Sequence, residues 1–103
     1  MATPCAIRVE GISYVELYKH WDGMPSATLQ WLEDFNAEAS KALGEDTTYK
    51  FAALVRSSIR DAEKYGLDDN KFTGWGIYPY GKMVVDYTYT LKKDGSVTYE
   101  RSE

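Results

Sequence analysis

The sequence predicts an α+β fold of two layers, with an antiparallel sheet of about four strands carrying two helices on one face, in the order ββααββ. Short segments near both ends of the chain alternate between apolar and polar residues, as half-buried strands do. The middle of the chain instead repeats its apolar residues every three or four positions, as helices do. Strands therefore cluster before and after a helical region, and this order favours an α+β arrangement.

The first two strands are predicted over residues 5–10 and 14–20. Cys5, Ile7 and Val9 form an apolar row on one side of the first strand, and the second strand alternates in the same way. Because only a few residues connect the two strands, they are expected to form an antiparallel hairpin.

The first helix is predicted to begin at Pro25 and to end at Gly44. Proline suits the first turn of a helix because its missing N–H has no partner there. Glycine suits the position after the last turn, where the backbone adopts the left-handed αL conformation. The apolar stripe of this helix is expected to contain Leu29, Leu32, Phe35 or Asn36, Ala39 and Leu43.

The second helix is predicted to follow at once, because residues 45–48 (Glu-Asp-Thr-Thr) offer side chains that cap a helix N-terminus. Gly66 is expected to end it, with Leu67 folding back on the last turn. Its apolar stripe is expected to contain Phe51, Leu54, Val55, Ser58, Ile59 and Ala62.

Residues 68–76 are predicted to form a loop from their composition, which is rich in Asp, Asn and Gly. Ile77 and Tyr78 are expected to begin a short strand that Pro79 interrupts, since proline cannot donate to a β-ladder.

The clearest strand is predicted over residues 83–91, where alternation is sustained for nine positions. Asp94 and Gly95 are a strong hairpin signal, and residues 97–101 continue the alternating pattern as the last strand. The tyrosines expected to pack beneath the helices are Tyr87, Tyr89 and Tyr99.

Length and charge limit the classes of function. The chain has 103 residues, which fits a single domain over residues 1–103, and its net charge is −4. Nucleic-acid binders carry a basic patch or stripe, and the nearest approach to one here is the pair Lys92 and Lys93. We therefore expect no nucleic-acid partner.

The single cysteine, Cys5, cannot form an internal disulfide, so a reducing compartment is the simpler setting. The N-terminus lacks the charged and apolar segments of a signal peptide. No apolar stretch approaches the length of about 18 residues that spans a membrane. The expectation is a cytoplasmic protein with no membrane partner.

Residues 18–25 (Tyr-Lys-His-Trp-Asp-Gly-Met-Pro) are the most chemically diverse stretch of the chain, and they include its only histidine. His20 could act as a general acid or base, with Asp22 orienting its ring. The alternative interpretation is structural: Asp22 and Gly23 make the turn into the first helix, and Trp21 anchors it. We favour the structural interpretation, so no catalytic residues are expected, and His20 with Asp22 remain the catalytic alternative.

Metal and cofactor sites are not expected. One His and one Cys cannot supply a structural zinc site. Residues 68–70 (Asp-Asp-Asn) lack the spacing and the closing Glu of a calcium loop. The glycines of residues 74–76 (Gly-Trp-Gly) match no phosphate-binding loop and are expected to let the chain pass close to the sheet.

A protein partner is the binding function that the composition favours, because aromatic residues and arginine dominate the energetics of protein interfaces. Arg56 and Arg60 lie four positions apart on one face of the second helix, although solvated neighbours at this spacing are common. The aromatic residues expected in or near loops, where they could anchor a partner, are Trp21, Trp75, Tyr78 and Tyr80.

Residues 16–25 (Glu-Leu-Tyr-Lys-His-Trp-Asp-Gly-Met-Pro) resemble a segment of small, functionally uncharacterised proteins of archaea, bacteria and their phages. Those proteins carry a His-Trp-Asp-Gly-Tyr-Pro box after a strand. The resemblance extends through residues 28–32 and 56–58 to residues 73–76. This chain differs at Met24, where the box has an aromatic residue, and the resemblance implies no particular activity.

Two functions from different classes follow. The first is a small cytosolic protein-binding domain, an accessory protein of a phage or mobile element that acts by occupying the surface of a partner protein. It would work as a monomer or a homodimer. The alternative is a small-molecule-binding or hydrolytic site built around His20 and Asp22.

Overall fold

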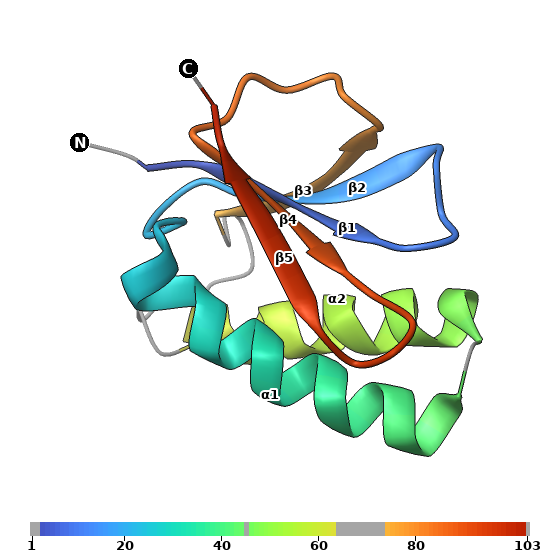
Figure 1. Cartoon of the computed structure of the whole chain (residues 1–103). Coiled ribbons are helices and arrows are strands. Elements are labelled where there is room, and N and C mark those ends of the chain that lie inside the picture. The colour runs from blue at the N-terminus through green and yellow to red at the C-terminus, as the bar shows by residue number, and fades with distance from the viewer. Residues whose placement is uncertain (1–2, 45, 64–73, 103) are drawn as a thin grey trace.

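The computed structural model describes residues 3–44, 46–63 and 74–102, with only the backbone described for residues 59–63. Five strands and two helices are present in these parts of the chain (Figure 1). In chain order they are β1 (Cys5–Val9), β2 (Val15–Lys19), α1 (Pro25–Leu43), α2 (Thr47–Glu63), β3 (Trp75–Pro79), β4 (Tyr87–Leu91) and β5 (Val97–Arg101).

The strands form one mixed sheet in the order β3-β2-β1-β4-β5. The fold is α+β, but the predicted four-stranded antiparallel sheet is wrong in both the number and the direction of its strands. The two predicted hairpins, β1–β2 and β4–β5, are present. They join through β1 and β4, which run parallel, with Ile7 opposite Tyr89. Alternation within a strand does not specify its neighbours, so the sequence pattern could not supply this pairing.

The predicted loop over residues 68–76 is wrong at its end, because strand β3 already begins at Trp75. The predicted interruption at Pro79 is also wrong, because Pro79 is the last residue of this strand. The amide of His20 donates to the carbonyl of Gly74 and the amide of Tyr80 to that of Tyr14, at 2.8 and 3.1 Å. Antiparallel pairing alternates, so the N–H position of Pro79 faces away from β2 and its absence removes no ladder bond. Residues 68–73 of the predicted loop lie outside the described residues.

Strand β4 is shorter than predicted, because it begins at Tyr87 rather than at residue 83. β3 and β4 both run parallel to β1, so the chain must return across the sheet between them. Residues 80–86, here called the crossing segment, make this return on the face without helices (Figure 1). Val85 in this segment is buried, and the amide of Asp86 donates to the carbonyl of Pro4 at 2.9 Å.

The hydrophobic core lies between the sheet and the two helices, which share one face of the sheet (Figure 1). The predicted apolar row of β1 is confirmed, since its three members are buried against the helices. Leu17, Tyr89 and Leu91 extend this layer on the neighbouring strands. The buried core cluster contains Cys5, Ile7, Val9, Ile12, Leu17, Leu32, Leu54, Tyr89 and Leu91.

Helix α1 has the predicted bounds, from Pro25 in its first turn to Gly44 as its C-cap. Asn36 is fully buried on its inner face, and Phe35 is half-buried beside it. Gly44 has φ 63° and ψ −131°, so it is not in the αL conformation that was predicted. This region of backbone space is open to glycine and strained for other residues.

Helix α2 is capped by Asp46, one of the predicted candidates. Its Oδ1 accepts hydrogen bonds from the Tyr49 amide at 3.2 Å and the Thr48 hydroxyl at 2.8 Å. These bonds, the Tyr49 amide first, lower the pKa of the Asp46 carboxyl. Leu54 and Ser58 are buried as predicted. The predicted helix end at residues 66–67 and the side chains of residues 59 and 62 lie outside the described part of the chain.

Candidate functional site

The turn between β2 and α1 is fixed by backbone geometry. Asp22 has a positive φ of 56°, which L-residues adopt rarely. Gly23 is buried where the chain passes β1, and a Cβ atom there would lie 2.6 Å from the carbonyl oxygen of Thr3 and 2.7 Å from the Cβ of Cys5. The Tyr89 hydroxyl also donates to the carbonyl of Gly23 at 2.6 Å. The turn that was expected at Asp22 and Gly23 is therefore present and tightly packed.

His20 is held by aromatic neighbours. Its Nδ1 lies 2.7 Å from the hydroxyl of Tyr18, and its ring meets the Trp21 ring edge-on at 4.9 Å between centroids. Burial raises the pKa of the Tyr18 hydroxyl above its ordinary value of 10, so this hydroxyl stays protonated well into the basic range. The carbonyl of Asp22 accepts a hydrogen bond from Thr28 of α1 at 2.6 Å. The hydrogen-bonding partner of the His20 ring is therefore the Tyr18 hydroxyl, whereas the backbone of Asp22 is bonded to α1.

Trp21 packs across Gly74, the residue that precedes β3. Gly74 has φ 79°, and a Cβ atom at this position would collide with the indole of Trp21. Gly76 lies under the ring of Tyr78 in the same way, since a Cβ atom there would lie 2.8 Å from that ring. Each glycine therefore allows an aromatic ring to lie directly on the backbone, a role that differs from the predicted one of letting the chain pass close to the sheet.

The face of the sheet without helices carries a row of rings, here called the aromatic row: Tyr78, Tyr18, His20 and Trp21. Tyr78 meets Tyr18 edge-on, with 5.4 Å between ring centroids, and Tyr18 lies 5.9 Å from His20. Because Tyr18 and Tyr78 alternate with core residues such as Leu17, their side chains point away from the helices.

Arg8 and Glu16 form an ion pair on the same face. The Nε of Arg8 donates to Glu16 at 2.8 Å, and the Glu16 side chain is only 1% exposed although no helix covers it. Arg8 also stacks on the ring of Tyr80 at 4.0 Å from its centroid and donates to its hydroxyl at 3.1 Å. The start of the crossing segment therefore closes over a buried carboxylate whose charge is balanced by Arg8.

Large apolar side chains remain exposed on this side of the molecule. Val84, at the middle of the crossing segment, is 94% exposed, next to the buried Val85. Trp21 and Tyr80 are each 45% exposed, and Tyr14, whose carbonyl binds the Tyr80 amide, is 66% exposed. The name exposed patch is used below for Tyr14, Trp21, Tyr80 and Val84.

Trp75 lies on the opposite face of the sheet from Trp21. It packs edge-on against Trp31 of α1 with 5.6 Å between centroids, and the Nζ of Lys19 lies 5.4 Å from its ring centroid. Trp31 donates to the hydroxyl of Ser57 at 2.9 Å, which joins α1 to α2. Trp21 and Trp75, both predicted as anchors for a partner, are therefore on opposite faces of the sheet.

Arg56 lies on the outer side of the two helices. It borders a hollow of about 410 Å³ between α1 and α2, together with Asp34, Phe35 and Glu38. The structure does not describe the side chain of Arg60. The six residues predicted to bind a partner thus fall into separate regions: Trp21, Tyr78 and Tyr80 share the helix-free side, whereas Trp75 and Arg56 do not.

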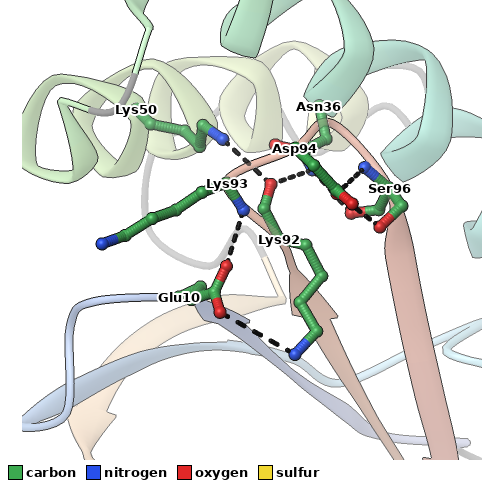
Figure 2. Close-up of polar contacts among 7 residues, drawn as sticks. All are labelled: Glu10, Asn36, Lys50, Lys92, Lys93, Asp94 and Ser96. Carbon is green, nitrogen blue, oxygen red and sulfur yellow. Dashed lines mark hydrogen bonds and ion pairs between the residues drawn. The ribbon is translucent and has the colours of Figure 1, made fainter.

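A polar cluster at the other end of the sheet joins the β4–β5 turn to both helices (Figure 2). The side-chain nitrogen Nδ2 of Asn36 donates to the backbone carbonyls of Lys92 and Ser96 at 2.9 and 2.8 Å. The buried ammonium of Lys50 donates to the Ser40 hydroxyl at 2.7 Å and to the Lys92 carbonyl at 3.3 Å. Lys50 was not predicted as part of any site, because its position beside Phe51 on an amphipathic helix was its only signal in the sequence.

The same turn is closed by its own side chains (Figure 2). Asp94 accepts hydrogen bonds from the amide and the hydroxyl of Ser96 at 2.9 and 2.6 Å, and these bonds lower the pKa of the Asp94 carboxyl. Glu10, beyond the end of β1, accepts from the amide of Lys93 at 2.7 Å. These contacts satisfy backbone groups, so the cluster fixes the hairpin in place.

In the parts of the chain that the structure describes, no group of three or more His, Cys, Asp or Glu side chains could hold a metal ion. No described helix has the length and apolar character needed to cross a membrane. Cys5 is buried beneath the helices, and burial raises the pKa of its thiol to about 12.

Comparison with protein-family profiles, with curated proteins and with solved structures finds no match. The feature that sequence reasoning missed is the crossing segment, whose signal was the turn-forming pair Pro79 and Gly81. Gly81 has φ 75°, and the Lys82 amide closes this turn on the carbonyl of Pro79 at 3.0 Å.

Proposed function

We propose that this protein is a protein-binding domain whose partner contacts the helix-free side of the sheet. The observation that carries the proposal is the exposed patch: among the described residues, four of the seven large apolar side chains that are well exposed lie on this side. Tyr14 and Tyr80 lie beyond one end of the β2–β3 pair and Trp21 beyond the other, and the aromatic row runs between them. Exposed apolar side chains that are concentrated on one side of a protein mark interaction sites more often than scattered ones do. Trp21 and Tyr80 supply the aromatic anchors that dominate interface energetics.

A protein fits this surface better than a nucleic acid does. The chain has a net charge of −4, and Arg8, the arginine of this face, is already paired with Glu16. A phosphate backbone would need unpaired basic groups near the aromatic rings. The aromatic row also packs edge-on within itself, which favours a side-chain surface over a series of open stacking platforms.

The finer part of the proposal is that the protein is a cytoplasmic accessory protein of a phage or mobile element and acts by occupying a partner's surface. It is supported by the resemblance of residues 20–25 to the box found in small proteins of archaea, bacteria and phages. The genes beside the coding gene test this part directly. Phage or mobile-element genes are the expected neighbours, and a stable set of metabolic genes would contradict it.

The binding surface is tested with immobilised baits in lysate of the native host. We expect at least one protein that is retained by the wild type and lost with Val84→Glu and with Trp21→Ala. The matched control is Tyr49→Ala, because Tyr49 is 66% exposed but lies in the first turn of α2. Equal retention by all four baits, or no specific retention by the wild type, would contradict the proposal.

The alternative function remains a small-molecule-binding or hydrolytic site at His20 and Asp22. One observation favours it, namely the hydrogen bond that orients the His20 ring through Tyr18. Hydrolysis of p-nitrophenyl acetate is a simple probe, compared for the wild type, His20→Ala and Val84→Glu. Activity lost only in His20→Ala would support this alternative, and equal background rates in all three would count against it.

A further inference from the structure

The outer edge of β5 presents unpaired backbone groups in a defined pattern. The amide of Lys92 donates to Ser96 and the amide of Ser102 donates to Asp86, each at 2.8 Å. Residues at even positions of β5 therefore bond to β4, and pairing in antiparallel strands alternates. It follows that both the N–H and the C=O of Val97, Tyr99 and Arg101 point away from the sheet.

β5 is the last strand in the order β3-β2-β1-β4-β5, and no other described segment pairs with its outer edge. The opposite edge ends in Pro79, which cannot donate a hydrogen bond to an added strand. β5 has neither a proline nor a bulge, and four of its five residues are exposed. An edge with these properties is a template for another strand.

We propose that a second copy of this chain pairs with β5 in the antiparallel direction, with Tyr99 opposite the second copy's Tyr99. In this register Val97 lies opposite the second copy's Arg101, and the reverse pair follows by symmetry. All three outward-facing residues of each strand then exchange hydrogen bonds, which satisfies the whole free edge. A two-fold axis generates the arrangement, as in most homodimers.

Side-chain chemistry favours this register over its neighbours. Thr98 lies opposite the second copy's Glu100, so a hydroxyl can donate to a carboxylate on each side of the axis. The neighbouring register that places Tyr99 opposite the second copy's Arg101 also sets Glu100 against the second copy's Glu100. Like charges directly opposite destabilise a sheet. The other neighbouring register, which places Tyr99 opposite the second copy's Val97, sets Arg101 against Gly95. Gly95 is in the hairpin turn and not in β5.

Tyr99 provides the apolar contact at the axis. Its side chain lies on the helix side of the sheet with those of Tyr89 and Tyr87, at centroid distances of 5.6 and 6.4 Å, and it is still 46% exposed. Pairing across the axis would add the second copy's Tyr99 to this cluster. The helix-free side stays uncovered in such a dimer, so this inference is independent of the proposed function.

Sedimentation velocity over a range of concentrations tests the dimer with two variants of opposite charge. Thr98 is exposed in the single chain, so the fold should tolerate both changes, which circular dichroism of each variant checks. Thr98→Lys should tighten the dimer roughly two- to thirty-fold, because it places an ammonium group opposite the second copy's Glu100 on each side of the axis. Thr98→Glu should weaken it by a similar factor. A wild type that stays monomeric at millimolar concentration, or equal behaviour of both variants, would overturn the proposal.

Amide hydrogen exchange locates the contact. The amides of Val97, Tyr99 and Arg101 should become more protected as concentration rises, whereas the amides bonded to β4 should change little. Tyr99→Pro removes one outward N–H without removing a bond to β4, and it should abolish self-association in a chain whose circular dichroism is unchanged. Dimerisation that survives in folded Tyr99→Pro, or protection on another surface, would overturn the register.

Discussion

Lys50 is a lysine in an environment that is unusual for a charged side chain. Its side chain is 1% exposed, and its ammonium donates to a hydroxyl and a carbonyl. Burial lowers the pKa of Lys50 below its ordinary value of 10.5, and the carboxylates of Glu10 and Asp94 only partly offset this. The unfolded chain therefore holds this proton to higher pH than the folded protein does.

Replacement of Lys50 by Met should make this effect visible. Between the lowered pKa and about 10.5 the unfolded state binds more protons, so Lys50 makes the free energy of unfolding rise with pH. Below that window both states are charged and the desolvation cost is present in full. The stability of the wild type relative to Lys50→Met should therefore increase as pH rises toward 10.5, measured by urea unfolding.

The matched control for this prediction is Lys82→Met, because Lys82 is exposed in the crossing segment. Its stability relative to the wild type should not change in the direction expected for Lys50→Met. A flat difference between the wild type and Lys50→Met across the window would show that the ammonium is well solvated in the folded protein.

Substitutions at Gly74 and Gly81 allow the free-energy cost of backbone strain to be compared with the cost of a steric clash. Their φ values are 79° and 75°, but only at Gly74 would a Cβ atom meet the ring of Trp21, whereas Gly81 has open space around it. Gly81→Ala should cost about 1 kcal/mol from strain alone. Gly74→Ala should cost about 1–3 kcal/mol more, because the indole must shift. Thermal and urea unfolding measure both.

A double-mutant cycle identifies the ring responsible. In a Trp21→Ala background the extra cost of Gly74→Ala should largely disappear, while the cost of Gly81→Ala should stay the same. An unchanged cost of Gly74→Ala in that background would mean that Trp21 does not pack on this glycine.

The turn between β2 and α1 shows which features can be predicted from the local sequence and which cannot. Asp22 and Gly23 were predicted to form the turn, and they do. The reason for Gly23 could not be predicted, because its lack of a Cβ is required by Thr3 and Cys5, which precede it by many residues. His20 shares its strand face with Tyr18 by simple alternation, but that hydrogen bond became evident only with the ring orientations.

At the scale of elements, the β4–β5 hairpin depends on Asn36 of α1. One amide group holds two turn carbonyls, and Asn36 is fully buried. Asn36→Ala should lower the free energy of unfolding by about 1–3 kcal/mol, because two hydrogen bonds from a buried side chain are lost. The loss stays moderate because both acceptors keep other donors: the Lys92 carbonyl accepts from the Gly95 amide and the Lys50 ammonium, and the Ser96 carbonyl from the Lys92 amide. Urea unfolding monitored by circular dichroism measures this loss.

The control for this prediction is Gln30→Ala, which removes an exposed side-chain amide of the same helix that donates to Asp34 at 2.9 Å and should cost less. Hydrogen exchange should also show that Asn36→Ala exposes the Lys92 amide, which bonds to Ser96 across the turn. An unchanged Lys92 amide would mean that the turn's own Asp94 contacts are sufficient.

The elements differ in how readily the sequence revealed them. Both helices were predicted because their apolar stripes extend over many turns and their caps are distinct. β3 was predicted as a loop up to Gly76, since glycines that let rings lie on a strand look like loop residues in composition. Residues 83–86 of the crossing segment were assigned to a strand, because Val84 and Val85 alternate between exposed and buried in the same way that strand residues do.

At the scale of the whole molecule, the parallel pairing of β1 with β4 determines where the candidate site lies. It requires the crossing segment, which places Tyr80 and Val84 on the side that the helices leave uncovered. Trp21 and Tyr78 join them there, while strand order places Trp75 on the other face. Residue types could suggest binding residues, but only the order of the strands could show which of them share a surface.

The most direct test of the helix-free side as the binding surface is site-specific photo-crosslinking in cells that produce the protein. A photoreactive amino acid at position 84 should give a discrete heavier species that contains a partner protein, and one at position 49 should not. Substitution of Trp21 by Ala should reduce the species formed from position 84. A species formed equally from both positions, or only from position 49, would contradict the account.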